Sequence, residues 1–178
     1  MTRGSTRRSF LRVGLAGGAL LTLSAIVGRS LTGYSLPPGT PRPRTLSEKE
    51  LLVLAAAVAR LVAPDGPDAP PADPLALALW LDGHLATMDA AIVADVRALL
   101  HFVEHGGPLF RLRATRFTRM GAAEQDATLD AFADSPLALR RQGLQGLRAL
   151  AFLAYYRDDR TFALLGYPGP MIARTAAP

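Results

Sequence analysis

Residues 137–170 read LALRRQGLQGLRALAFLAYYRDDRTFALLGYPGP, and they predict a long helix followed by a rigid turn. In the first half, leucines recur near helical spacing while polar residues take the other side, which is typical of a helix with one face in water. The apolar set is Leu137, Leu139, Leu144, Leu147 and Leu150, and the polar set is Arg140, Arg141, Gln142, Gln145 and Arg148. This half is therefore expected to be amphipathic.

The second half of the same helix has a different pattern. Residues 149–156 read ALAFLAYY, which is apolar on every side and typical of a helix surrounded by neighbours. We therefore expect this half to lie in the core. Charged residues 157–160 interrupt the run, and the sequence GYPGP at residues 166–170 cannot continue a helix. The pattern predicts a surface turn that carries Tyr167.

Length and composition indicate one domain plus an appended segment. A domain drawn from 178 residues can bury a core without the support of a metal or a disulfide. The chain has no cysteine, which excludes disulfides, thiolate metal sites, a cysteine nucleophile and covalent haem attachment.

The positive charge of the chain is concentrated at its N-terminus. The formal net charge is +5, but seven of the 20 basic residues precede Leu46, where there is no Asp or Glu. The remaining basic residues accompany all 15 acidic ones, so the rest of the chain is close to neutral. Whole-chain charge therefore gives no support to nucleic-acid binding.

The N-terminal segment has the layout of a bacterial twin-arginine (Tat) export signal. Arg7, Arg8, Phe10 and Leu11 precede an apolar run at residues 13–27. Fifteen helical residues reach only about 22 Å, short of the roughly 30 Å hydrocarbon layer. The length of the apolar run therefore favours an export signal over a permanent membrane anchor. We expect residues 1–30 to be recognised by the twin-arginine translocase. The protein is then expected in the periplasm or on the outer face of the cytoplasmic membrane.

A tether and then a helical domain are expected after the signal. Residues 31–45 are rich in proline and glycine, which is typical of a tether, and residues 46–178 form the predicted domain. Ser47 and Glu50 match a capping box at the start of a helix that runs to Pro64. The inward stripe expected for this helix is Leu51, Leu54, Ala55, Val58, Leu61 and Val62.

Three further segments complete a predicted all-α fold, a compact bundle of five or six helices. Asp73 and Pro74 predict the cap and first turn of a helix to about Thr87. A second helix is expected from Asp89 to about Glu104 and a third over residues 122–134, with an irregular basic connector at residues 108–120 between them. No segment alternates as strands do. The expected inward residues are Ile92, Val96, Leu99 and Val103, then Leu129, Phe132 and Ala133.

One motif matches the zinc-binding motif of an enzyme class. His101, Glu104 and His105 match the HisXXGluHis pattern of inverted zinc peptidases, in which two histidines bind zinc and the glutamate acts as base. Steps of about 100° per residue from Ile92 place both histidines opposite the inward stripe. Because a zinc peptidase also needs a third ligand and a cleft, we expect no catalysis and no metal here. A zinc enzyme is kept as an alternative.

The basic connector offers a second candidate surface. Four arginines alternate with two phenylalanines, a pattern that indicates either a solvated connector or a docking face for an acidic partner. An exported protein is not expected to meet nucleic acid, so we predict no nucleic-acid partner. The residues are Arg111, Arg113, Arg116, Arg119, Phe110 and Phe117.

Several stretches together resemble the subunit 3 family of gluconate 2-dehydrogenase. They are the twin-arginine segment, a helix opening LSEKE and running into VAPDGP at residues 62–67, AYYRD at residues 154–158, and LGYPGP at residues 165–170. The resemblance implies a small, non-catalytic accessory subunit with no cofactor of its own. Its expected partner is the large FAD-dependent subunit of a membrane-associated dehydrogenase of the glucose-methanol-choline type, and in some systems a cytochrome c subunit completes the complex.

The resemblance also suggests why the export signal is present. A flavoprotein must fold around FAD before export, and the twin-arginine route carries folded cargo, so a bound small subunit can supply the signal for both and support maturation. The alternative is a stand-alone exported helical binding protein. Large aromatic and arginine side chains carry interface energy, and they cluster after the long helix. The predicted docking residues are Tyr155, Tyr156, Arg157, Phe162, Tyr167 and Pro168, with Tyr155 and Phe162 equally consistent with core positions.

Overall fold

The computed structural model describes residues 33–62, 69–106 and 115–169, and it divides the chain into two compact units, Met1–Ser35 and Leu36–Pro178. The predicted export signal lies outside the described residues. Every regular element among the described residues is a helix, so the all-α prediction is confirmed for them. The α-helices are α2 (Glu48–Leu61), α3 (Pro74–Leu85), α4 (Ala90–His101), α6 (Ala122–Ala133) and α7 (Ala138–Tyr156), with a π turn η1 (Phe102–Gly106) and 3-10 turns η2 (Phe117–Arg119), η3 (Asp159–Thr161) and η4 (Ala163–Leu165).

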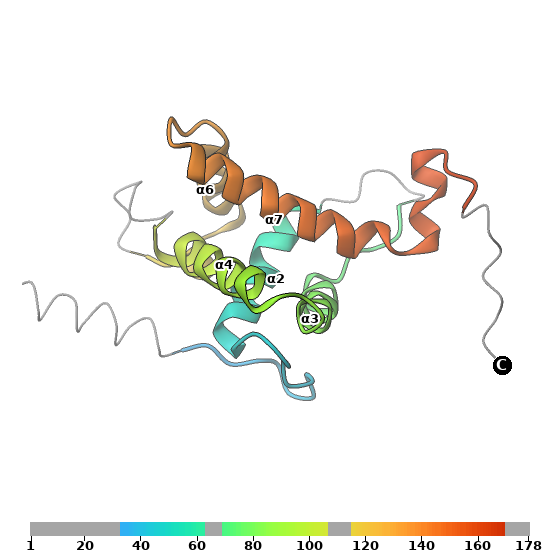
Figure 1. The fold of residues 1–178 in the computed structure, drawn as a ribbon, viewed down its shortest axis with the longest axis horizontal. Helices are drawn as coiled ribbons and strands as arrows, with labels where there is room; N and C mark the ends of the chain where they lie inside the picture. Colours follow the sequence, from blue (N-terminus) through green and yellow to red (C-terminus); the bar gives the residue numbers. More distant parts are fainter. Residues whose placement is uncertain (1–32, 63–68, 107–114, 170–178) are drawn as a thin grey trace, which may run out of the picture. The chain divides into compact units, whose positions relative to one another are not determined.

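Helix α2 lies at the centre of the Leu36–Pro178 unit and contacts α3, α4, α6 and α7 (Figure 1). The predicted capping box starts it: Ser47 N donates to Glu50 Oε2 at 2.7 Å, and Glu50 N donates to Ser47 Oγ at 3.3 Å. The predicted stripe is largely buried, but Val53 and Ala57 are buried as well. Because neighbours surround α2, every residue from Lys49 to Leu61 is buried or half-buried.

Helix α3 packs on α2 and also holds the segment that precedes α2. Asp73 caps α3 by accepting from Leu75 N at 3.0 Å, as Asp73 and Pro74 predicted. The carboxylate of Asp82, which is 2% exposed, accepts hydrogen bonds from Thr45 N at 3.0 Å and Leu46 N at 2.7 Å. Arg44 N is a third donor to it. The C-terminal part of the proposed tether is thus attached to the domain, and Leu36 packs against the core.

The inward side of α4 differs from the predicted stripe. Val96 and Val103 are buried as predicted, but Ile92 was expected to be inward and is 46% exposed. Leu100, which was not part of the predicted stripe, is fully buried. The α-helix also ends at His101 and continues as the π turn η1, in which hydrogen bonds reach one residue further. Gly106 closes this turn under the ring of Phe102, where a Cβ would lie only 2.5 Å from Phe102 Cδ2.

Helices α6 and α7 pack against each other and against α2. Leu129 and Phe132 of α6 are buried as predicted, and Leu144 and Leu147 of α7 are too. Leu139 was predicted inward but is 80% exposed, because it lies about 110° around α7 from the buried side. The prediction is also wrong for Leu137, which precedes the first turn of α7 and is 55% exposed.

The second half of α7 is not buried on every side, which corrects the prediction that it lies in the core. Ala151, Ala154 and Tyr155 are buried where α7 packs against the other helices, but Phe152 is 43% exposed and Leu153 is 45% exposed. The described neighbours of α7 all lie against one side of it, so the other side meets solvent. Within the described residues, no helix has both the length and the apolar character that crossing a bilayer requires.

Candidate functional site

The HisXXGluHis motif lies where α4 passes into η1. His101 is exposed, as predicted, whereas His105 is only half-exposed. Glu104, between them, is fully buried. Its carboxylate accepts hydrogen bonds from Thr118 Oγ1 at 2.7 Å and from Thr118 N at 3.0 Å. The π turn advances each residue by less than the 100° of an α-helix, which rotates Glu104 into the core.

Lys49 of α2 lies between the two histidines of the motif. Its Nζ is 3.3 Å from His101 Nδ1 and 3.0 Å from His105 Nε2, so the ammonium donates to ring nitrogens that a metal would need. Burial lowers the pKa of His105, and the positive charge of Lys49 lowers that pKa further. Burial also lowers the pKa of Lys49. Among the described residues there is no group of three or more His, Cys, Asp or Glu that is arranged to hold a metal ion.

A second buried carboxylate belongs to the same polar cluster. Glu50 is 6% exposed and accepts from Ser47 at the start of α2. Its carboxylate also lies 3.4 Å from His101 Nε2 and 3.7 Å from Arg97 Nε, both on α4. Both glutamates are therefore engaged by donors from other elements, and the cluster connects α2, α4 and η2. Its geometry is that of a structural junction.

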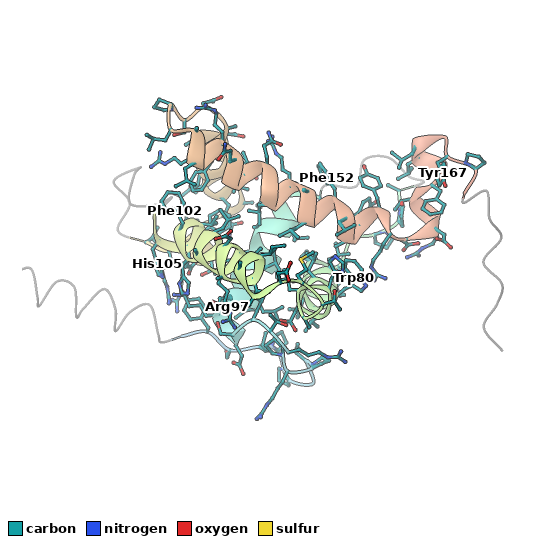
Figure 2. All side chains as sticks on the ribbon, viewed as in Figure 1. Trp80, Arg97, Phe102, His105, Phe152 and Tyr167 are labelled. Atoms are coloured by element: carbon teal, nitrogen blue, oxygen red, sulfur yellow. The ribbon has the colours of Figure 1, made fainter. Side chains whose placement is uncertain are left out.

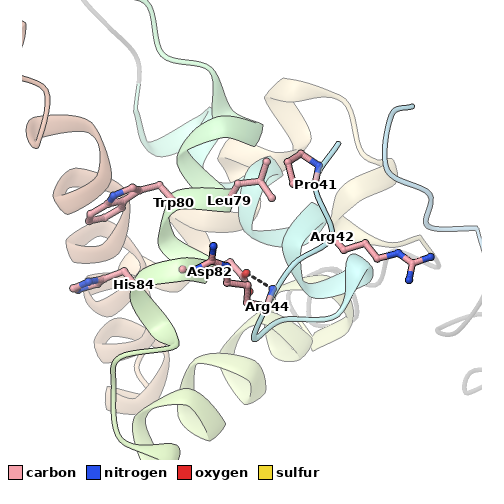
Figure 3. A pocket seen from close by; sticks show the side chains of 8 residues that line it. Pro41, Arg42, Arg44, Leu79, Trp80, Asp82 and His84 are labelled. Carbon is pink, nitrogen blue, oxygen red and sulfur yellow. Dashed lines mark hydrogen bonds between the residues drawn. The ribbon is translucent and has the colours of Figure 1, made fainter. Parts of the chain in front are cut away.

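A depression of about 450 Å³ lies beside α3 (Figure 3). Trp80 and His84 of α3 stack with ring centroids 5.2 Å apart. The guanidinium of Arg157, the residue after α7, lies 4.9 Å from the centroid of the Trp80 ring. Asp82 points to the other side, toward the backbone of Arg44. Because backbone N–H groups already occupy the Asp82 carboxylate, its role in the depression is to hold the segment before α2.

The predicted docking residues fall into two groups. Tyr155 is 7% exposed and its hydroxyl donates to the Pro70 carbonyl at 2.9 Å, so it is a core residue. Tyr156 is 37% exposed and Tyr167 is 45% exposed, and both reach solvent. The others are the exposed Arg157 and Pro168 and the half-buried Phe162. Whether they bind a partner stays a prediction.

The turn around Tyr167 is well defined. Gly166 adopts a left-handed φ of +62°, which glycine tolerates, and Tyr167 N then donates to the Phe162 carbonyl at 2.9 Å. The Tyr167 ring meets that of Phe162 edge to face at 5.2 Å. Hydrogen bonds from Arg160 lower the pKa of Asp158 to about 2, so this carboxylate stays ionised where it caps η3. The aromatic side chain of Tyr167 is presented on a preorganised turn.

Large apolar residues are exposed on α7 and on the segment that follows it, and of these the sequence analysis had identified Tyr156 and Tyr167 but not the other four. Figure 2 shows Phe152 along α7 and Tyr167 beyond its end. We call this set the outer face: Phe152, Leu153, Tyr156, Leu164, Leu165 and Tyr167, each at least 37% exposed. The sequence does contain a pattern that predicts a second apolar stripe on α7. This stripe recurs at i, i+3, i+4 and i+7, opposite the buried one, and consists of Ala149, Phe152, Leu153 and Tyr156.

Comparison of the chain with models of protein families, with curated proteins and with solved structures finds no match in any of the three.

Proposed function

We propose that this chain is a non-catalytic accessory subunit that binds a large FAD-dependent dehydrogenase, supports its maturation and carries it through the twin-arginine export route. The observation that supports this proposal is the outer face. It lies within residues 147–170, one of the three stretches in which the sequence resembles the gluconate 2-dehydrogenase subunit 3 family.

The physical argument is that the outer face combines exposure with the residue types that dominate interfaces. Phe152 and Tyr156 contact each other edge to face at 6.0 Å while both remain open to solvent. Exposed apolar patches mark contact sites, and aromatic side chains contribute most to binding. A permanent partner would cover this surface.

The N-terminal sequence supports the export part of the proposal. Arg7 and Arg8 followed by Phe10 and Leu11 match a twin-arginine signal, and that route suits a flavoprotein that folds around FAD before export. FAD belongs to the partner, whose active site chooses the substrate, and a cytochrome c subunit is a further expected component. The complex would act in the periplasm or on the outer face of the cytoplasmic membrane.

The test is co-expression of the full chain, tagged at its C-terminus, with the flavin oxidoreductase encoded beside it. We expect a large subunit with the absorbance of bound FAD to co-purify, and both proteins to reach the periplasm. Replacing both arginines, Arg7→Lys with Arg8→Lys, should leave both proteins in the cytoplasm. Failure of any flavoprotein to co-purify with the parent chain would contradict the proposal.

A further inference from the structure

A heptad pattern lies along the solvent side of α7. Five residues follow one another at intervals of three and four, as the a and d positions of a coiled coil do, and all are exposed. We call them the α7 seam. Its members are Gln142, Gln145, Ala149, Phe152 and Tyr156. The seam spans four turns, about 21 Å, on the side opposite the buried residues Leu147, Ala151 and Ala154.

The shape of the seam suits a helix. Its middle is shallow, because Ala149 is small and a Cβ added at Gly146 would meet nothing within 4 Å. Its C-terminal end carries large exposed side chains, those of Phe152, Leu153 and Tyr156. Small residues let a second backbone approach closely, while large residues fill the holes between its side chains.

The charge beside the seam is of one sign. Helix α7 contains three arginines and no acidic residue. Arg141 and Arg148 immediately precede Gln142 and Ala149, which are a positions, so they occupy the flanking g positions that form interhelical ion pairs. Arg148 makes no ion pair with any residue that the structure describes.

We propose that the α7 seam binds an amphipathic helix of the partner, with apolar residues at the facing heptad positions and carboxylates beside them. The partner's identity rests on the proposed function, whereas the kind of element bound follows from the seam alone. A second copy of this chain fits less well, because two α7 helices would bring arginines together without an acid. A membrane surface also fits less well, because Gln142 and Gln145 make the first half of the seam polar.

The test uses the full chain and two synthetic helical peptides. Both peptides carry leucine at a and d positions, and they differ only in glutamate or lysine at e and g. We expect the glutamate peptide to bind roughly tenfold more tightly by fluorescence anisotropy, and the difference to shrink as salt is raised. Arg148→Glu should remove this preference.

Two further variants separate the seam from general stickiness. Phe152→Asp should weaken binding of the glutamate peptide by roughly thirtyfold, the loss typical of a hot-spot aromatic. Ile92→Asp is the matched control, because Ile92 is 46% exposed against 43% for Phe152 but lies on α4. It should bind as the parent does.

Several outcomes would overturn the proposal. They are equal binding of the two peptides, unchanged binding by Phe152→Asp, dimerisation of the chain through α7, or binding to phosphatidylglycerol vesicles that Phe152→Asp abolishes while neither peptide binds. If the dehydrogenase co-purifies with Phe152→Asp as it does with the parent, the seam inference fails and the proposed function stands. If the peptide results hold but no dehydrogenase co-purifies, the proposed function fails and the seam inference stands.

Discussion

Helices α2 and α7 are both rich in apolar residues, but they use them differently. Helix α2 is surrounded by four other helices and buries almost its whole length. Among the residues that the structure describes, the neighbours of α7 lie on one side of it, and Phe152, Leu153 and Tyr156 are exposed. The pattern of α2 predicted one wet face and that of the second half of α7 predicted none, which is the reverse of what the structure shows.

Apolar residues on every side of a helix therefore indicate that several of its faces make contacts. They do not indicate whether those contacts lie within the domain or with another molecule. In α2 small residues such as Ala57 complete the packing within the domain. In α7 a second apolar stripe has no counterpart among the described residues. We propose that an external partner covers this stripe, because exposed apolar patches mark contact sites.

The largest expected loss of stability comes from a substitution in the core around α2. Leu54 is fully buried, so Leu54→Ala should lower the free energy of unfolding by about 2–5 kcal/mol through lost contacts and the cavity left behind. Urea unfolding followed by circular dichroism measures it. A loss below about 1 kcal/mol would show that α2 is not the centre of the fold.

The next effect concerns the segment that Asp82 attaches to α3. Asp82→Ala removes the acceptor of three backbone N–H groups and should cost about 1.5–3 kcal/mol of unfolding free energy. Asp82→Asn keeps one acceptor oxygen and should lose less in the same urea titration. Equal stability of the parent and Asp82→Ala would mean that residues 36–45 are independent of the domain.

A smaller effect is expected from pH at the Lys49 cluster. The pKa of His105 is lowered from 6.5 by burial, then by Lys49, with His101 and Arg116 acting in the same direction and Glu104 opposing them. The unfolded chain therefore binds this proton more readily, so stability is complete above pH 6.5 and falls as pH drops below it. His105→Gln should flatten this fall in urea titrations between pH 7.5 and 5. An unchanged slope would remove His105 as its source.

The smallest effect on stability is expected on the outer face. Phe152→Ala should change the unfolding free energy by only about 0.5 kcal/mol, because the side chain is 43% exposed. Tyr167→Ala should likewise leave the melting temperature unchanged, yet cost on the order of 2 kcal/mol of partner binding if it is a hot spot. Unfolding of either variant alone would make the outer face structural.

Local signals allowed much of the fold to be predicted. The Ser47 capping box and the cap of Asp73 with Pro74 depend on residues within one turn, and both are confirmed. The orientation of Ile92 and Leu139 depends on which side a distant helix covers, which helical spacing alone cannot specify. The π turn that buries Glu104 was also missed, because it depends on the contact with Thr118, fourteen residues away.

The most direct test of the central claim is hydroxyl-radical footprinting of this chain alone and in complex with the flavin dehydrogenase. The reaction reports the solvent exposure of individual side chains, so Phe152, Tyr156 and Tyr167 serve as probes and Ile92 and Leu139 as exposed controls. We predict that the complex protects the three aromatic residues and leaves both controls as reactive as in the free chain. Unchanged modification of the aromatic residues in a fully formed complex would contradict docking at the outer face of α7.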